Sequence, residues 1–144
     1  STANASSWDN ATSGISQNLY GITFGNNTFV AVGTSGKIVR STDNGSSWDN
    51  ATSPITTDIK GVTYGNGLFV TVGWSGTILR SMDNGSSWDN ATSPTAYGLK
   101  GIAFGHNTFV AVGDNGTIVR STDNGSSFDN VTSPTLKYLY GVGF

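Results

Sequence analysis

The sequence contains no cysteine and no glutamate, and it has a single histidine, His106. The lack of cysteine excludes disulfide bonds, thiolate catalysis and zinc sites built on cysteine. Charged residues make up 11% of the 144 residues, the net charge is -2, and Lys and Arg never form a run. A binder of nucleic acid or of an anionic membrane would carry a basic patch, and no apolar run approaches the roughly 18 residues of a membrane span. We therefore expect neither nucleic acid nor a membrane as a partner.

The residues that are abundant are Gly, Ser, Thr and Asn, alongside 35% hydrophobic and 11% aromatic residues. That apolar content is higher than in disordered chains, so the chain is expected to fold. It begins at Ser1 and not at Met, which predicts a mature or excised segment. The weakly charged, hydroxyl-rich composition predicts an extracellular or cell-surface location.

An aromatic residue recurs every 40 residues, at Trp8, Trp48, Trp88 and Phe128. A glycine recurs with the same spacing at 21, 61, 101 and 141. Residues 1–144 therefore form a single repeat array, which divides into a partial unit 1–20, full units 21–60, 61–100 and 101–140, and the start of another unit at 141–144. A period of about 40 residues is typical of β-propeller blades.

Each full unit contains four short segments of high β-propensity, which in the first unit are 21–24, 28–32, 37–41 and 47–51. We refer to them as strands A, B, C and D. Gly-containing turns separate A from B and B from C, and no segment has the apolar spacing of a helix. The sequence thus predicts an all-β protein made of four-stranded antiparallel propeller blades, with an incomplete ring in one chain because known propellers need about four to eight blades.

The link between strands C and D is Ser41-Thr42-Asp43-Asn44-Gly45-Ser46-Ser47-Trp48. It resembles the Asp box, Ser-x-Asp-x-Gly-x-Thr-Trp, of the bacterial neuraminidase repeat. Asp accepts hydrogen bonds from turn amides, Gly adopts a positive φ and Trp packs the hairpin. Ser replaces Thr in every copy, Phe128 replaces Trp, and Ser1–Trp8 has Ala in place of Asp and Gly. The resemblance implies structural roles for Ser41, Asp43, Gly45, Trp48, Ser81, Asp83, Gly85, Trp88, Ser121, Asp123, Gly125 and Phe128.

The segment 61–73 is also similar to propellers related to photosystem II stability and assembly factors, and to uncharacterised bacterial Asp-box repeat proteins. This resemblance implies a fold and not an activity. Asp boxes occur in sialidases, other glycosidases, lectin-like modules, sorting receptors and assembly factors alike.

The sequence lacks the combinations of residues that known catalytic sites of this fold would need. A sialidase would need an arginine triad and a Tyr-Glu pair, but Arg40, Arg80 and Arg120 occupy one repeated position and are expected to pair locally. A glycosidase needs two neighbouring carboxyl groups, and the only acidic residues specific to one unit, Asp58 and Asp114, lie in different units. His106 stands in an A–B turn, and the Asp43–Gly45 stretch lacks the further ligands of a calcium loop. We predict no catalytic residue, no metal and no cofactor.

The differences between units cluster in the D–A connections (55–59, 95–99, 135–139) and in the B–C turns (34–35, 74–75, 114–115). In an antiparallel meander these connections emerge on one face, and the Asp boxes lie on the other. Free divergence of exposed loops would give the same pattern. If instead the face binds a ligand, its candidate residues are Trp74, Tyr97, Tyr138, Asp58 and Asp114.

Three functional hypotheses remain at this point. The first is a non-enzymatic binding or scaffold module that recognises a glycan or a protein through this face. The second is an engineered or excised propeller fragment whose main property is self-assembly, and the third is a fragment of a glycoside hydrolase. Unpaired blade faces predict a homo-oligomer, with a dimer favoured, in which the terminal D and A strands of two copies meet in a ring of about seven or eight blade positions.

Overall fold

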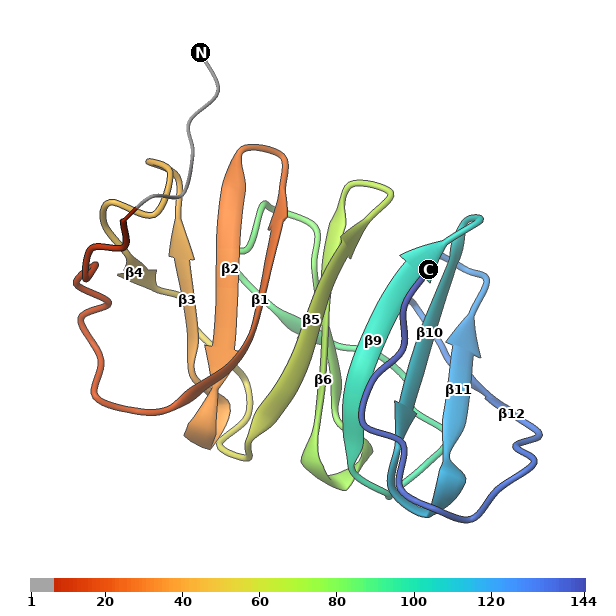
Figure 1. Ribbon diagram of the computed structural model, residues 1–144. Helices are drawn as coiled ribbons and strands as arrows, with labels where there is room; N and C mark the ends of the chain where they lie inside the picture. Colours follow the sequence, from red (N-terminus) through yellow and green to blue (C-terminus); the bar gives the residue numbers. More distant parts are fainter. Residues whose placement is uncertain (1–6) are drawn as a thin grey trace.

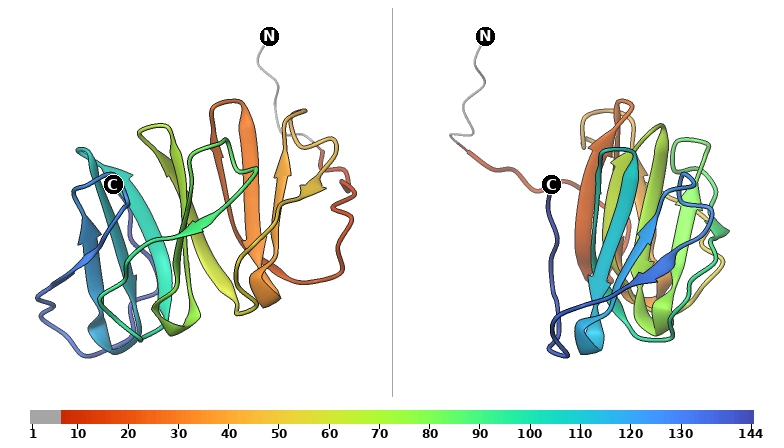
Figure 2. Two further views of the ribbon diagram at one scale, coloured as in Figure 1. Left: turned by 180° about the vertical axis from the view of Figure 1, so that it is seen from behind. Right: turned by 90° about the vertical axis from the view of Figure 1, so that its right-hand side faces the viewer.

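A computed structural model of the chain describes residues 7–144, which form three four-stranded antiparallel sheets standing side by side (Figure 1). The first sheet, blade 1, is followed by blades 2 and 3 in chain order. Blade 1 comprises β1 (Leu19–Gly25), β2 (Thr28–Gly33), β3 (Ile38–Ser41) and β4 (Asp49–Asn50); blade 2 comprises β5 (Ile59–Gly65), β6 (Leu68–Gly73), β7 (Ile78–Ser81) and β8 (Asp89–Asn90); blade 3 comprises β9 (Leu99–Gly105), β10 (Thr108–Gly113), β11 (Ile118–Ser121) and β12 (Asp129–Val131). The all-β prediction is confirmed, and the three blades form an open row and not a closed ring (Figure 2).

Strand boundaries differ from the prediction at both ends of each blade. Strand A begins at Leu19, Ile59 or Leu99, two residues before the repeated glycine, with an irregular register between the two positions. Strand D is only two or three residues long, because the Asp box occupies the chain up to its aromatic residue.

The chain forms no strand at residues 7–11 or 139–144, where partial D and A strands were expected. The physical reason is the same in both places: a strand needs a hydrogen-bonded neighbour, and no described strand pairs with these segments. Residues 7–18 make one parallel bridge, Thr12 to Ser47, and the amide of Leu139 donates to the Gly113 carbonyl at 3.0 Å.

The hydrophobic core lies between the blades. Val30, Val32 and Ile38 of blade 1 pack against Ile59, Phe69, Leu79 and Trp88 of blade 2. The same arrangement recurs one blade later, where the cluster contains Val70, Val72, Ile78, Leu99, Ile102, Phe109, Val119 and Phe128. Blade 2 therefore buries both of its faces against neighbouring blades, and blades 1 and 3 bury one face each in this way, as expected of quasi-one-dimensional repeats.

Glycines allow the blades to approach one another closely. A Cβ atom on Gly25 would overlap the ring of Tyr64 in blade 2, and one on Gly65 would overlap the ring of Phe104 in blade 3. Each ring also packs on a phenylalanine of its own blade, such as Phe69 below Tyr64 with the ring centroids 4.8 Å apart. These positions are predicted to reject any side chain.

Polar groups also link the blades, on the Asp-box side. The Arg40 guanidinium donates to the Asn84 carbonyl of the next blade at 3.1 Å, and Arg80 donates to the Ser126 hydroxyl at 2.7 Å. The side-chain amide of Asn26 donates to that of Asn84 at 3.2 Å. Arg40 and Arg80 thus bond to the Asp box of the neighbouring blade. The prediction that they pair locally is wrong for these two residues.

The only helical elements among residues 7–144 are three short 3₁₀ turns, η1 (Thr34–Gly36), η2 (Trp74–Gly76) and η3 (Asp114–Gly116). None of them is long or apolar enough to cross a bilayer.

The close approach at Gly65 predicts a specific loss of stability. Gly65→Ala should lower the free energy of unfolding by about 1–3 kcal/mol, because the Phe104 ring must shift. Gly143→Ala is the matched control, since a Cβ atom there meets nothing within 4 Å. Urea denaturation of the two variants measures the difference, and equal stabilities would contradict this account of blade packing.

Candidate functional site

Backbone hydrogen bonds hold the D–A connections and the B–C turns together on one face of the row, which we call the connection face. The amides of Thr34, Trp74 and Asp114 donate to the carbonyls of Asn18, Asp58 and Gly98 at 2.9–3.0 Å. Each bond ties a B–C turn to the segment leading into its own blade. The variable positions therefore lie on one face, as the sequence predicts.

A cluster of aromatic and charged side chains lies on this face at the first strand of each blade (β1, β5 and β9), which we call the inner strand. The Lys60 ammonium stands 3.7 Å from the centre of the Tyr20 ring and 5.8 Å from that of Trp74. It also pairs with Asp58 at 3.3 Å. We call Tyr20, Asp58, Lys60 and Trp74 the inner-rim cluster; cation–π contacts of this kind stabilise by about 0.5–2 kcal/mol.

Hydrogen bonds set the electrostatics of this cluster. The Ser35 amide donates to Asp58 at 3.0 Å, and this bond is the first cause of a lowered pKa of the Asp58 carboxyl, with Lys60 adding to it. The Thr34 hydroxyl donates to the Tyr20 phenol oxygen at 3.3 Å and lowers the pKa of Tyr20. Asp58 therefore holds the B–C turn of blade 1 and orients Lys60.

The pattern continues in blade 3. Lys100 pairs with Asp114 at 3.3 Å, as Lys60 pairs with Asp58. Gly98 leaves room for this carboxylate and for the backbone of Trp74, since a Cβ atom there would lie 2.8 Å from Asp114 Oδ2 and 4.0 Å from Trp74 Cα. Further along, the Tyr138 and Tyr140 rings meet edge to face, 6.5 Å apart. Aromatic and lysine side chains thus follow the inner strands from blade to blade.

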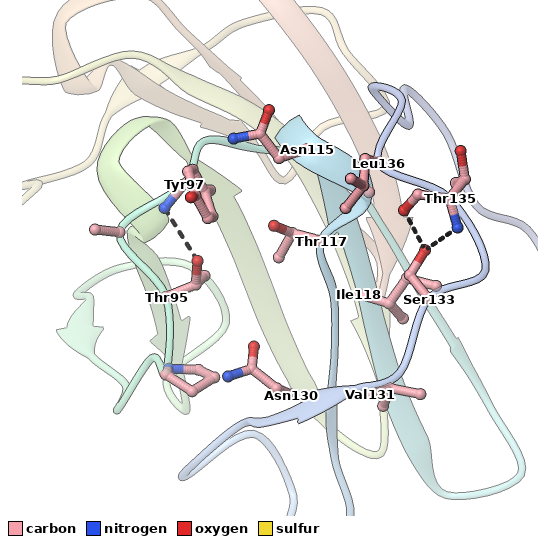
Figure 3. Close-up of a pocket in the computed structure, with 13 residues that line it drawn as sticks. Thr95, Tyr97, Asn115, Thr117, Ile118, Asn130, Val131, Ser133, Thr135 and Leu136 are labelled. Carbon is pink, nitrogen blue, oxygen red and sulfur yellow. Dashed lines mark hydrogen bonds between the residues drawn. The ribbon is translucent and has the colours of Figure 1, made fainter.

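A separate groove of about 410 Å³ lies farther out on blade 3 (Figure 3). Tyr97 and Leu136 stand on opposite sides of it, with the amides of Asn115 and Asn130 and the hydroxyl of Thr117 around it. The hydroxyl of Thr95 accepts a hydrogen bond from the Tyr97 amide at 3.0 Å and so fixes the side of the groove that carries Tyr97. An aromatic ring with amides and hydroxyls is the usual composition of a neutral, polar binding site.

The five predicted ligand residues therefore fall into different environments. Trp74, Tyr97 and Tyr138 are each about half exposed. Trp74 and Asp58 join the inner-rim cluster, Asp114 and Tyr138 lie in the next two repeats of that pattern, and Tyr97 lines the groove. Whether any of them contacts a ligand stays a prediction.

Sequence reasoning missed Tyr20, Lys60, Lys100 and Tyr140. These four residues occupy one repeated position, immediately before the repeated glycine, and they vary between Tyr and Lys. The variable D–A segments identified from the sequence end one residue earlier, at 59, 99 and 139. Extending the comparison by that one residue would have found them.

The segments that resemble Asp boxes, for which we keep that name, form turns held together by their own side chains. The Asp43 carboxylate accepts hydrogen bonds from the Ser47 amide at 2.9 Å, the Ser47 hydroxyl at 2.6 Å and the Ser41 hydroxyl at 2.7 Å. Gly45 has φ +82°, and the Trp48 indole donates to its carbonyl at 3.1 Å. The serine that replaces the usual threonine therefore supplies the same hydroxyl.

These hydrogen bonds, above all those from the serine at the end of the box, lower the pKa of Asp43, Asp83 and Asp123 from 3.8 to about 2. The bonded carboxylates act as structural acceptors within the turn. Among residues 7–144 there is no group of three or more His, Asp, Cys or Glu side chains that could hold a metal ion. His106 is exposed at the A–B turn of blade 3, with its ring edge-on to Phe144 at 4.9 Å.

Together, the meander order of four strands, the core between blades and the Asp boxes define a β-propeller architecture. Solved structures agree with this class. The chain is similar to a structure described as YCF48 bound to D1 peptide, with 20% identity, a TM-score of 0.70, and coverage of 83% of this chain and 41% of that one. YCF48 from Cyanidioschyzon merolae matches at 23% identity and a TM-score of 0.66, over 83% of this chain and 38% of that chain.

The computationally designed Ika4 protein has a TM-score of 0.73 at 13% identity, over 96% of this chain and 87% of that chain. The chain thus spans about two fifths of the YCF48 structures but nearly all of Ika4. No protein-family model and no curated protein sequence matches. At these identities the likeness establishes the β-propeller fold.

The lowered pKa values predict loss of stability in acid. An aspartate with a depressed folded-state pKa stabilises fully above its unfolded value of 3.8, and that contribution is lost as the pH falls towards about 2. Asp83→Asn should be less stable at pH 7 and should lose less stability between pH 4 and pH 2 than the parent chain. Urea midpoints from pH 7 to 2 measure this against Asp89→Asn, which makes the same charge change at an exposed side chain outside the box. Equal pH dependence of Asp83→Asn and the parent chain would contradict the prediction.

Proposed function

We propose that this protein is a non-enzymatic binding module whose connection face, centred on the inner-rim cluster, recognises a segment of another protein. The observation that supports this most is the exposed Trp74 ring beside Lys60 and Tyr20. Trp and Tyr are enriched among the residues that dominate protein interfaces. A propeller of similar fold has been solved with a bound peptide, which is consistent with the proposal.

The charges of the cluster favour a binding role over catalysis. Asp58 pairs with Lys60 of β5, and Asp114 pairs with Lys100 of β9 in its own blade, so each carboxylate has a cationic partner. They also belong to different blades and are not a pair flanking one bond, as glycoside hydrolysis requires. The GH74 enzyme from Niastella koreensis shares the fold at a TM-score of 0.61, but this chain spans only 18% of it. A glycosidase fragment is therefore the least supported hypothesis.

The peptide proposal predicts a selective loss on Trp74→Ala. Peptides selected from a displayed random library on the parent protein should bind Trp74→Ala at least about tenfold more weakly, because the variant loses an aromatic anchor. Met82→Ala removes an exposed apolar side chain at the opposite, Asp-box end of its blade and should bind normally. Unchanged circular dichroism confirms folding. A library that enriches no peptide would contradict the proposal.

A glycan bound in the groove beside Tyr97 is the alternative to a protein segment as the ligand. Its ring, amides and hydroxyls carry no net charge, which suits a neutral sugar. On a glycan array, bound sugars should be lost with Tyr97→Ala and retained with Trp74→Ala. An array and a peptide selection that both fail would remove the binding hypothesis as a whole.

The second candidate function is self-assembly, in which copies of this chain complete a propeller. It is supported by the apolar side chains that the first blade exposes, Leu19, Ile22 and Phe24, and by the likeness to a designed propeller of similar extent. Exposed apolar faces of repeat proteins drive association. We infer that a homodimer is the favoured assembly.

Self-assembly predicts a solution mass of twice the 14.9 kDa of one chain. Light scattering coupled to size exclusion at micromolar concentration measures it. A folded monomer of one chain mass would contradict this second function and would leave the binding proposal unaffected.

A further inference from the structure

The two ends of the row present opposite halves of the interface that joins the blades internally. Towards the preceding position, blade 1 exposes Leu19 (41%), Ile22 (59%) and Phe24 (50%). Their counterparts in blade 3, Leu99 and Ile102, are 0% and 8% exposed because blade 2 covers them. Blade 1 therefore lacks only the cover that a preceding blade supplies.

Blade 3 carries the matching half. The residues of blade 2 that cover Leu99 and Ile102 are Val70, Val72 and Ile78, and blade 3 repeats them as Val110, Val112 and Ile118. Arg120 of blade 3 occupies the position of Arg40 and Arg80, which bond to the Asp box of the next blade. Among the described residues Arg120 makes no hydrogen bond or ion pair, and its side chain is exposed.

In the single chain, the segment that ends at Phe144 occupies this side of blade 3. Its ring lies on Gly105, as the Tyr64 ring lies on Gly25 and the Phe104 ring on Gly65. The segment 139–144 thus stands where the inner strand of a following blade would stand. The segment covers this side of blade 3 only in part. Val112 is 5% exposed and the Leu139 amide bonds to Gly113, but Phe144 is 84% exposed and the segment is not part of a sheet.

We propose that blade 3 of one copy docks directly on blade 1 of a second copy, with Arg120 bonding to the Asn44 carbonyl or the Ser46 hydroxyl of that copy. This proposal rests on the self-assembly function and specifies its contact. Phe24 of the second copy replaces Phe144 on Gly105. Residues 7–18 are held to blade 1 by the Thr12–Ser47 bridge, and β12 of the other copy displaces them. Thr92 and Ser127 form the same bridge between blades 2 and 3.

A second possible contact is a seam made only from the terminal D and A segments of two copies. The two arrangements differ in how well they bury Leu19 and Ile22. Such a seam would hold no equivalents of strands B and C, which carry the residues that bury Leu99 and Ile102. Leu19 and Ile22 would then stay in water. Direct docking supplies Val110, Val112 and Ile118 at each of two contacts and places three blades from each copy in one ring, within the four to eight blades that propellers use.

The test is sedimentation equilibrium of the full chain and five single variants. Arg120→Gln and Ile22→Ser alter exposed side chains, so each should keep the fold and raise the dimer dissociation constant at least about tenfold. Lys137→Gln and Met82→Ser remove the same charge and a comparable exposed apolar side chain elsewhere, and both should associate like the parent chain. Phe144→Ala removes the competitor for Gly105 and should associate as tightly as the parent or more tightly.

Three results would overturn the proposal. A parent chain that stays monomeric removes the docking contact and the self-assembly function together. A dimer that is insensitive to Arg120→Gln or Ile22→Ser leaves self-assembly standing and places the contact elsewhere. Weakened association of Phe144→Ala would show that 139–144 belongs to the seam, in favour of the terminal-strand arrangement. Peptide binding by the inner-rim cluster is independent of all three.

Discussion

The structure depends on one constraint: a blade has no core of its own and must bury both faces against neighbours. Val30, Val32 and Ile38 are buried only because blade 2 lies against them, and Ile59 and Phe69 only because blade 1 does. Glycines at 25 and 65 set the spacing, since each receives an aromatic ring from the following blade. Stability therefore accumulates at the contacts between blades, and any blade at the end of a row leaves apolar surface unpaired.

Polar chemistry is divided between the two faces of the row. On one face the Asp boxes use their carboxylates internally, so that Asp43 and its copies are occupied by serine amides and hydroxyls. The arginines use the same boxes to join one blade to the next. On the connection face Trp74, Tyr97 and Tyr138 remain about half exposed, and Lys60 lies over the Tyr20 ring. Rigid, repeated hairpins thus support a face whose residues differ from blade to blade, which is the arrangement expected of a binding scaffold.

Much of the fold could be predicted because its causes are local. The 40-residue period, the β-prone segments and the Gly-bounded turns determine four strands per blade, and the Asp-box sequence determines its own hydrogen bonds. The site was less predictable. Trp74 and Asp58 follow from comparing the repeats, but the contact of Lys60 with the Tyr20 ring joins blade 2 to blade 1. That contact is not visible in the spacing of the chain.

The sequence by itself determined the repeat, the strand order and which face carries the variable residues, because antiparallel hairpins alternate between two ends. Only the tertiary structure decided where strands stop: residues 7–11 and 139–144 were expected to be strands but lack partner strands. It also decided that Arg40 and Arg80 reach the neighbouring Asp box and that Phe144 lies on Gly105. The physical reason is that these contacts depend on the distance between blades, which is set by packing across the whole interface and not by any one segment.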